Sequence, residues 1–324
     1  MNKVTINDIA KRTGYSKSTI SCALNGKKGV GEEKRKEIIR CAQEMGYTPN
    51  SFARSLSGRT YNTIGVILRD LTNPFYANVF CAIDKFCEER NYETIFYNLA
   101  GDSNRIITGL DLMKGKMVSG IILDFFGNDD HITEQIKQLG IPTVIFGFSI
   151  DKEISSVETN DENGAKKAVD YAVECGHKDI YYVTNKNNDI FNTRRSFAIS
   201  QRMKELNLDF DNHVINVEPS TCAKTIIENC PKDSVLICYN DVLACAVISG
   251  LMKEKMYVPE HYSVIGFDNL SIIPYSLTSV DIPQYEMATQ ASKLLFEQIE
   301  ERKIERIKLE SQLIIRDSVK TLTK

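Results

Sequence analysis

Residues 5–26, TINDIAKRTGYSKSTISCALNG, hold two short helical patterns that meet at a glycine. Thr5, followed three residues later by Asp8, matches the capping box that starts a helix, and the isoleucines of INDIAK recur on one helical face. Gly14 permits a sharp turn, after which the Ser16 hydroxyl can cap a second helix. The stretch therefore predicts two helices joined by a tight turn.

The second of these helices has two unlike faces when its residues are placed about 100° apart. One side is apolar: Ile20, Ala23 and Leu24. The other side carries short side chains, with a lysine at its start: Lys17, Ser18, Ser21 and Cys22. Asn25 ends the helix, and an amphipathic segment from Glu32 supplies a third. This pattern predicts a helix-turn-helix unit whose second helix enters the DNA major groove, because short side chains let the backbone approach.

Charge is distributed unevenly along the chain. Residues 1–59 contain 12 Lys and Arg against 5 Asp and Glu, a net of +7. The whole chain has 40 basic and 43 acidic residues, so the remainder has 28 against 38, a net of −10. A basic segment on an acidic body indicates a polyanionic partner such as DNA, although a solvated charged surface has the same composition.

The composition also narrows the class of protein. The 324 residues, 42% of them hydrophobic, suffice for two or three globular domains. No stretch approaches the roughly 18 apolar residues of a membrane-spanning helix, and no signal-peptide pattern is present, so we expect a cytoplasmic, nucleoid-associated protein without a membrane partner. The nine cysteines never form CxxC pairs and the four histidines are isolated. We therefore expect reduced thiols, no metal site and no cofactor.

After residue 62 the pattern is that of an α/β protein. Seven apolar runs are typical of strands: TIGVIL (63–68), ETIFYN (93–98), GIILDFF (120–126), TVIFGF (143–148), DIYYVT (179–184), SVLICY (234–239) and SVIGF (263–267). Amphipathic segments lie between them at 75–90, 161–175, 193–206, 241–256 and 285–302. Strands that alternate with helices predict parallel sheets. One sheet rarely accepts so many units, so we expect two similar subdomains.

Polar side chains gather where the predicted strands end, which is where open α/β sheets bind their ligands. The candidates are Asn73, Phe75, Arg195, Asn240, Asp241 and Asp268. Singly, the acids and amides can be ordinary helix caps or turn residues, and the arginine a surface residue. Together they suit a neutral polyhydroxylated ligand, because they supply paired hydrogen bonds to hydroxyls and an aromatic face for C–H groups.

Five motifs are spread over nearly the whole chain: VTINDIAKRTGYSKSTISCALNG (4–26), GYTPNSFARSL (46–56), DLTNPFYANV (70–79), NDVLA (240–244) and VIGFDN (264–269). In combination they resemble the LacI/GalR family of bacterial transcription regulators. The resemblance implies a helix-turn-helix headpiece, a hinge helix with linker, and a core with the fold of periplasmic sugar-binding proteins. The implied boundaries are 1–49 for the headpiece, 50–61 for the hinge, 62–160 plus about 285–310 for the core N-subdomain, and 161–284 plus about 311–324 for the core C-subdomain.

The resemblance also implies how the protein binds DNA. In such a regulator, the hinge helices of a homodimer lie in the minor groove of a palindromic operator. Asn50 would cap this helix, Leu56 would wedge between base pairs and Arg54 would lie near phosphates. The candidate DNA contacts are Thr5, Ser16, Lys17, Ser18, Ser21, Cys22, Asn25, Asn50, Arg54 and Leu56. Cys22 departs from the family pattern, in which a basic residue that reads a guanine is common, and Gly31 replaces the usual hydroxyl cap of the third helix.

The same resemblance implies a small-molecule effector bound between the core subdomains. Its implied contacts are Arg195, Asn240 and Asp268 as polar anchors and Phe75 as an apolar wall. Gly147 stands where many members carry a sugar-binding Asp, the chain has no Trp, and INVEPST (215–221) lacks a stacking aromatic. A sugar or sugar derivative is the expected effector, whereas Phe148 and Phe191 near the cleft favour a flatter or more apolar molecule.

Three classes of function fit an α/β body of this size. An enzyme would need a catalytic motif, and GxGxxG after the first strand, GxxxxGK[ST], GxSxG and HExxH are all missing from the sequence. An exported solute receptor would need a signal peptide, but a basic helix-turn-helix pattern takes its place. A transcription regulator uses both halves. We therefore expect a sequence-specific DNA-binding repressor, not an enzyme, that responds to a small molecule.

Overall fold

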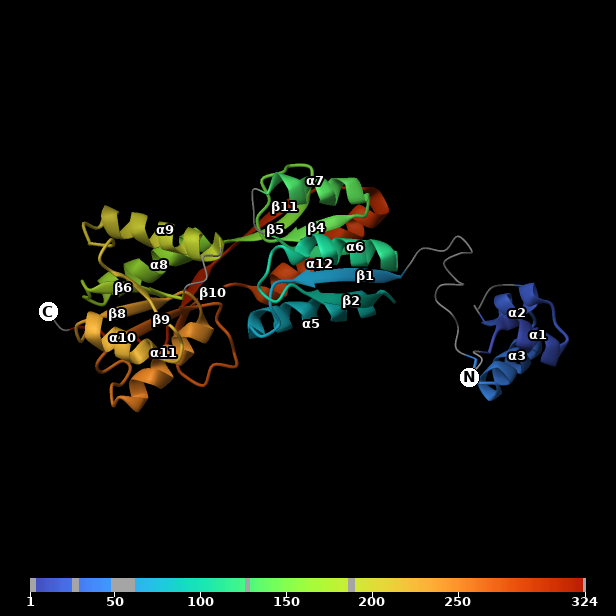
Figure 1. Cartoon of the computed structure of the whole chain (residues 1–324), viewed down its shortest axis with the longest axis horizontal. Coiled ribbons are helices and arrows are strands. Elements are labelled where there is room, and N and C mark those ends of the chain that lie inside the picture. Colours follow the sequence, from blue (N-terminus) through green and yellow to red (C-terminus); the bar gives the residue numbers. More distant parts are fainter. Residues whose placement is uncertain (1–3, 25–28, 48–61, 126–128, 186–189, 323–324) are drawn as a thin grey trace. The chain divides into compact units, whose positions relative to one another are not determined.

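The structure is a computed structural model that describes residues 4–24, 29–47, 62–125, 129–185 and 190–322, with only the backbone described at 190–191. The chain forms two compact units, Met1–Tyr61 and Asn62–Lys324. Figure 1 shows helices α1, α2 and α3 in the first unit and an α/β architecture in the second. None of the helices in the described ranges is long and apolar enough to cross a lipid bilayer.

The first unit, here called the headpiece, begins with two capped helices. In α1 (Ile6–Thr13), the Asp8 carboxylate accepts hydrogen bonds from the backbone N–H of Thr5 at 2.9 Å and from its hydroxyl at 2.7 Å. Gly14 ends the helix with a φ of 75°, a left-handed conformation that favours glycine. In α2 (Lys17–Leu24), the Ser16 hydroxyl accepts from the backbone N–H of Thr19 at 3.1 Å. Both predicted helix starts are therefore in place.

A third helix completes the headpiece and closes its core. α3 (Glu32–Glu44) packs on both other helices, and Gly31 at its start supplies no side-chain cap. Ile9, Ile20 and Ile38, one from each helix, are entirely buried together. Their mutual burial fixes the orientation of α2, so the side of α2 opposite Ile20 faces away from the core. The predicted helix-turn-helix fold is confirmed.

The first sheet of the core has six parallel strands in the order β11-β5-β4-β3-β1-β2. The strands are β1 (Thr63–Leu68), β2 (Glu93–Asn98), β3 (Gly120–Asp124), β4 (Thr143–Phe146), β5 (Ser155–Asn160) and β11 (Arg306–Glu310). Helices cover both faces (Figure 1). One face carries α5 (Pro74–Glu88) and α12 (Gln284–Glu301), and the other carries α6 (Arg105–Lys116) and α7 (Asp130–Leu139).

The second sheet also has six strands, in the order β12-β10-β9-β8-β6-β7, and only β12 is antiparallel. Its strands are β6 (Ile180–Thr184), β7 (Val214–Asn216), β8 (Val235–Cys238), β9 (Ser263–Phe267), β10 (Thr278–Asp281) and β12 (Gln312–Ile314). The pair α8 (Asp161–Glu174) and α9 (Ile190–Glu205) packs together, as does the pair α10 (Cys222–Asn229) and α11 (Asp241–Lys253).

The chain passes between the two sheets three times: from β5 into α8, from β10 into α12, and from β11 into β12. The crossings are closely packed. A Cβ atom added at Gly164 of α8 would lie 2.4 Å from Val280 of β10 and 3.0 Å from Cβ of Ser311 between β11 and β12. Two parallel-sheet lobes joined in this way confirm the predicted periplasmic-binding-protein-like fold. The space between the sheets, where parallel strands end, is where a ligand site is expected.

Candidate DNA-binding face and effector site

The free side of α2 carries the residues that the sequence assigned to DNA. Lys17 and Ser18 are exposed, whereas Ser21 and Cys22 are half-buried. None of the described acidic residues forms an ion pair with Lys17, so its charge is available to a phosphate or a base edge. Because these side chains are short, the α2 backbone can lie close to a surface that contacts it.

The two capping residues sit at the helix starts. The Ser16 hydroxyl is 2.7 Å from that of Ser18 and 2.8 Å from that of Thr19, so three hydroxyls cluster at the N-terminus of α2. Thr5 is exposed at the start of α1. Backbone N–H groups and hydroxyls at helix N-termini are favourable partners for phosphate. Four further candidates lie outside the described residues: Asn25, Asn50, Arg54 and Leu56.

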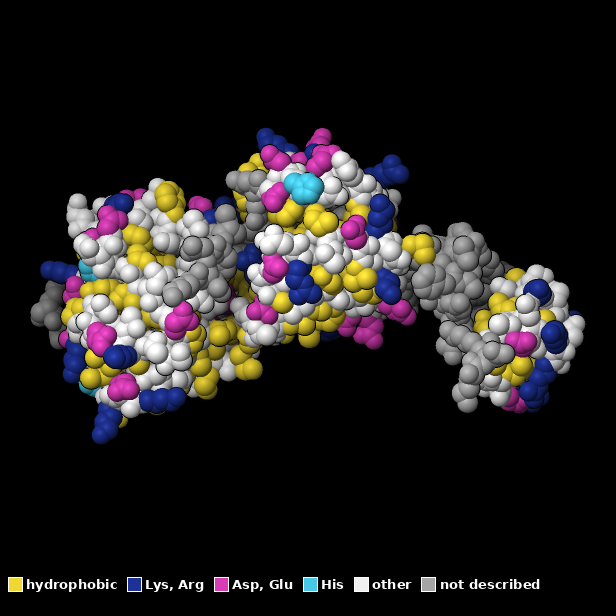
Figure 2. Space-filling model, in the orientation of Figure 1, with side chains coloured by type: hydrophobic (Ala, Val, Ile, Leu, Met, Phe, Trp, Pro, Cys, Tyr) yellow, Lys and Arg dark blue, Asp and Glu magenta, His cyan; other side chains and the backbone are white. Residues whose placement is uncertain are grey.

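Basic side chains gather on the headpiece surface (Figure 2). The exposed ones are Lys11, Arg12, Lys17, Lys34, Lys36 and Arg40. Glu44 lies 3.5 Å from Arg12 and 3.6 Å from Arg40, so it neutralises part of this charge. The remaining excess is the electrostatic feature that non-specific attraction to DNA requires.

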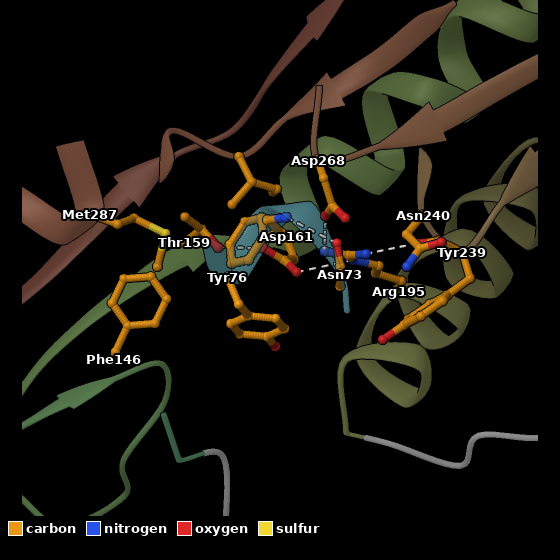
Figure 3. A pocket seen from close by; sticks show the side chains of 12 residues that line it. Asn73, Tyr76, Phe146, Thr159, Asp161, Arg195, Tyr239, Asn240, Asp268 and Met287 are labelled. Atoms are coloured by element: carbon orange, nitrogen blue, oxygen red, sulfur yellow. Dashed lines mark hydrogen bonds and ion pairs between the residues drawn. The ribbon is translucent and has the colours of Figure 1, made fainter. Parts of the chain in front are cut away.

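A small cavity lies between the two sheets of the core (Figure 3). It is lined by Asn73, Phe75, Tyr76, Phe146, Thr159, Asp161, Arg195, Tyr239, Asn240, Asp268, Ile282 and Met287. The centres of water-sized spheres can occupy about 30 Å³ of it. One water needs about 10–15 Å³ on this measure, so the cavity has room for about two waters. A ligand the size of a sugar enters only if the cavity widens.

Arg195 is the centre of the cavity wall. Its Nε lies 3.1 Å from Oδ2 of Asp161 and its Nη2 lies 3.4 Å from Oδ1 of Asp268, while Nη1 donates to the backbone carbonyl of Tyr239 at 2.7 Å. The guanidinium also stacks 4.5 Å from the ring centroid of Phe267. Figure 3 shows these groups converging on the cavity. Arg195 thereby joins α8, α9 and the ends of β8 and β9 in one buried network.

Burial perturbs the charges of this network. It raises the pKa of Asp268 to about 8, against the opposing effect of Arg195, with smaller increases from the carboxylates of Asp241 and Asp161. It also raises the pKa of Asp241 to about 6. Burial opposes the charge of Arg195, but Asp161 and Asp268 outweigh it and raise the pKa of the guanidinium above its usual value. Arg195 therefore stays charged while Asp268 takes up a proton near neutral pH.

Two asparagines at the cavity are helix caps. Oδ1 of Asn73 accepts from the backbone N–H of Phe75 at 3.0 Å, at the start of α5. Oδ1 of Asn240 accepts from the backbone N–H of Leu243 at 2.9 Å, at the start of α11. Because capping uses the oxygens, each side chain has its Nδ2 group left as a donor for a ligand. The capping role and the binding role are therefore compatible.

Aromatic rings form the apolar part of the wall. Phe75 packs edge-on against Tyr76, with ring centroids 5.1 Å apart, and lies 6.4 Å from Phe146. Ile282 and Met287 lie beside them. Such a wall suits a flat ligand or the C–H face of a ring.

Five of the eight sequence-predicted effector residues line this cavity: Asn73, Phe75, Arg195, Asn240 and Asp268. Asp241 lies behind the wall, where its carboxylate accepts from the hydroxyl of Ser279 at 2.6 Å and from the backbone N–H of Leu270 at 2.7 Å. Phe148 lies under the guanidinium of Arg194, which is 5.0 Å from its ring centroid, and not in the lining. The side chain of Phe191 is outside the described part of the structure.

The sequence did not point to the remaining lining residues, of which Asp161 matters most. Asp161 follows β5, whose sequence SSVETN is too polar to predict a strand, so the sequence does not mark Asp161 as a strand end. Tyr239 directly precedes Asn240 at the end of the predicted strand SVLICY, and this position is the signal that could have identified it. The described residues contain no group of three His, Cys, Asp or Glu side chains placed to hold a metal ion.

Comparison with protein families gives two matches. Residues 5–50 match the family described as bacterial regulatory proteins, lacI family. Residues 169–319 match a periplasmic binding protein-like domain. The first covers the headpiece helices, and the second covers most of the second sheet together with α12 and β11.

Similar proteins extend over nearly the whole chain. The HTH-type transcriptional repressor PurR of Aliivibrio fischeri (strain MJ11) is 28% identical over 97% of this chain and 98% of its own length. The lac repressor dimer bound to operator and the anti-inducer ONPF covers 98% of this chain and 100% of its own, with a TM-score of 0.85 at 17% identity. A LacI family regulator from Enterococcus faecium with bound ribose covers 81% of this chain and 100% of its own, with a TM-score of 0.71 at 24% identity.

Proposed function

Because this chain belongs to the lacI family of bacterial transcription regulators, we propose that it is a repressor whose operator binding is controlled by a ligand in the Arg195 cavity. It is a DNA-binding regulator and not an enzyme. The observation that carries the proposal is that one chain holds both a helix-turn-helix with an exposed Lys17 and a buried polar cavity between two parallel sheets. The proposal includes action on chromosomal DNA in the cytoplasm.

The ligand that best fits this proposal is a sugar or sugar derivative. The cavity combines an ion network, two amide donors and an aromatic wall, which together recognise hydroxyls and a C–H face. The similar regulator from Enterococcus faecium was solved with bound ribose. The same aromatic wall would also accept a nucleoside, which makes nucleosides the second class to screen.

Ligand entry supplies the conformational signal. Since the cavity has room for only about two waters, a ligand has to separate the sheets or turn the side chains between them. Arg194 on α9 lies 3.5 Å from Glu158 on β5 and above the ring of Phe148, so it ties the two lobes together. A ligand that changes the separation of the lobes therefore changes the contacts of Arg194 with Glu158 and Phe148. The free protein and the ligand-bound protein then have lobe arrangements of different energy, and the ligand shifts the population between them.

DNA binding is proposed to use two copies of the chain. A homodimer presents two α2 helices to the half-sites of a palindromic operator. Residues 50–61 would form the hinge helix and linker, with Asn50 as cap, Arg54 near phosphates and Leu56 between base pairs. A helix of two turns is only marginally stable alone in water, so we expect the hinge helix to form when the dimer binds DNA. Its formation would then depend on the spacing of the lobes.

The proposal is tested by titrating the full chain onto operator and scrambled duplexes, with and without ligands. Arg195→Ala is a poor variant, because it leaves Asp161 and Asp268 buried without a cation, at a cost of about 3–5 kcal/mol. Asp268→Asn keeps the shape of the side chain and leaves Arg195 its other partners. We expect the ligand response of Asp268→Asn to shift at least tenfold in ligand concentration while operator affinity without ligand is unchanged.

The matched control for this experiment is Asp211→Asn, an exposed carboxylate in the same lobe. It should behave as the wild type in both measurements. If Asp268→Asn and Asp211→Asn respond at the same ligand concentration, the cavity is not the effector site. If the wild type binds operator no better than scrambled DNA at every salt concentration tested, the regulator function itself is wrong.

A further inference from the structure

The Arg195 cavity holds more negative than positive charge. Among the described residues, three buried carboxylates surround one buried guanidinium: Asp161, Asp241, Asp268 and Arg195 are 3%, 1%, 4% and 5% exposed. With every group ionised the formal charge is −2, and with Asp268 protonated, as near neutral pH, it is −1. Arg316 contributes from outside the group, where its Nη2 donates to Asn269 at 2.6 Å. In a buried site this excess interacts strongly with any charge on a ligand, because little water screens it.

One carboxylate oxygen in the cavity is available to a ligand. Oδ1 of Asp268 faces Nη2 of Arg195, but no described residue donates a hydrogen bond to Oδ2. Asp268 also has a φ of 101°, a conformation that side chains other than glycine rarely adopt. A buried acceptor with an unused oxygen, held on a strained backbone at a cavity wall, is typical of a group kept for a ligand and not for stability.

On the basis of the proposed function, we infer that the effector places a hydrogen-bond donor, preferentially a protonated amine, on Oδ2 of Asp268, and that phosphate esters and other anions are excluded. An ammonium group offsets the excess negative charge and makes a charge-assisted hydrogen bond, which is roughly twice as strong as a neutral one. A phosphate would add two negative charges beside three carboxylates. The effector class is therefore a free or amine-bearing polyol or nucleoside.

The other polar groups of the wall fit the same class. Asn73 and Asn240 offer their Nδ2 donors to hydroxyl or carbonyl oxygens of a ligand. Three of the five N–H donors of Arg195 are taken by Asp161, Asp268 and the carbonyl of Tyr239, so its charge is partnered by protein groups before a ligand enters. The cation is organic, because the described carboxylates are not arranged to hold a metal ion.

The test uses matched ligands on the full-length protein. D-glucose, D-galactose and D-mannose are each compared with the 2-amino-2-deoxy sugar and the 6-phosphate, and adenosine is compared with its 5′-monophosphate. Thermal shift finds the set that binds, and isothermal titration calorimetry gives its dissociation constants. Within that set, we expect the amine to bind roughly tenfold tighter than the neutral member, a difference of about 1.4 kcal/mol, and the phosphate not to bind. The amine advantage should vanish in Asp268→Asn and persist in Asp211→Asn.

Proton release provides a second readout. Because burial raises the pKa of Asp268 to about 8, binding of an amine at pH 7 displaces a proton from this carboxyl, whereas binding of the neutral sugar does not. Calorimetry in two buffers with different ionisation enthalpies measures the difference. A phosphate ester that binds as tightly as its neutral partner, or an amine that releases no proton, overturns the inference.

A third arm needs no ligand and tests the excess of buried negative charge from which the inference is argued. At pH 8.5 the buried negative charges repel one another in the free protein, and Asp268→Asn removes one of them. We expect this variant to melt at a higher temperature than the wild type, while Asp211→Asn melts at the wild-type temperature. A lower melting temperature of Asp268→Asn contradicts the charge excess. Failure of the proposed function is distinct, because it appears as ligand binding that leaves operator affinity unchanged.

Discussion

Gly266 in β9 is the position at which one added methyl group should do most damage to the effector site. A Cβ atom there would lie 2.0 Å from Oδ1 of Asp241 and 2.9 Å from a methyl carbon of Leu277. The Asp241 carboxylate is 1% exposed and is held by the hydroxyl of Ser279 and the backbone N–H of Leu270. Gly266→Ala therefore has to displace a buried carboxylate that anchors the loop after Asp268.

The expected cost has two parts. Inserting a methyl group into a packed core costs about 1–3 kcal/mol. Moving Oδ1 of Asp241 away from Ser279 loses a hydrogen bond to a charged group, worth about 1.5–3 kcal/mol. The sum is roughly 2.5–6 kcal/mol, and for a unit of this size each kcal/mol lowers the melting temperature by about 2–4 °C. We expect a decrease of roughly 5–24 °C, together with a weaker response to ligand.

The assay is thermal and urea denaturation of full-length variants. Gly115→Ala is the matched control, because nothing lies within 4 Å of its added Cβ and it sits in the last turn of α6. This control should be neutral or stabilising by up to about 1 kcal/mol. Asp241→Ala removes the atom that clashes, so Gly266→Ala should cost far less in that background. A melting temperature of Gly266→Ala within 2 °C of the wild type, or an equal cost in both backgrounds, would refute the reasoning.

Three further changes test other parts of the molecule. Burial raises the pKa of Asp268 to about 8 and that of Asp241 to about 6, whereas an unfolded Asp has a pKa of roughly 3.9. Protonation of these two groups therefore stabilises the folded protein fully below about pH 4, and this contribution to the free energy of unfolding is lost as the pH rises to each folded pKa. Denaturation between pH 4 and 9 should show a loss that ends near pH 6 for Asp241 and near pH 8 for Asp268, and parallel plots of unfolding free energy against pH for the wild type and Asp268→Asn contradict this. Leu56→Ser should weaken operator binding well over tenfold and leave binding to scrambled DNA unchanged in gel-shift titrations, because only specific binding uses the wedge; equal operator affinity would exclude it. Cys22→Ser should keep operator binding and be insensitive to peroxide, since we interpret Cys22 as a contact residue; a wild type that loses binding in peroxide while the variant does not would identify a redox switch.

The sequence predicts the elements that follow simple periodic patterns. The run TIGVIL forms β1 over the same residues, and the capping pattern of Thr5 and Asp8 starts α1 where expected. These predictions succeed because a continuous apolar run and a local cap both act within a few residues. The two-lobed α/β core was also inferred, but its chain crossings came from the family resemblance, since no local pattern specifies which sheet a strand joins.

Two of the missed strands, β5 and β10, share a physical cause. The two strands have the sequences SSVETN in β5 and TSVD in β10, and most of their buried side chains are serine and threonine. A segment of this composition is predicted to be a loop. Their polar groups are satisfied at long range, as when the Ser279 hydroxyl donates to Asp241. The same limit explains Asp161, whose partner Arg195 is 34 residues away in the sequence and is brought to it by the packing of α9 on α8. Charge excess in the cavity is therefore a property of the fold and not of any segment.

The last strand of each sheet comes late in the chain, at Arg306–Glu310 and Gln312–Ile314. Ile307 pairs with Val157, 150 residues earlier. At a synthesis rate of about 5–20 residues per second, this interval corresponds to roughly ten to thirty seconds on the ribosome. During that time β5 presents an unpaired edge, which is a template for association with other chains. The β5 edge is therefore the part of the first sheet that stays open to association during synthesis, and a message truncated before codon 306 yields a chain in which neither sheet can be completed.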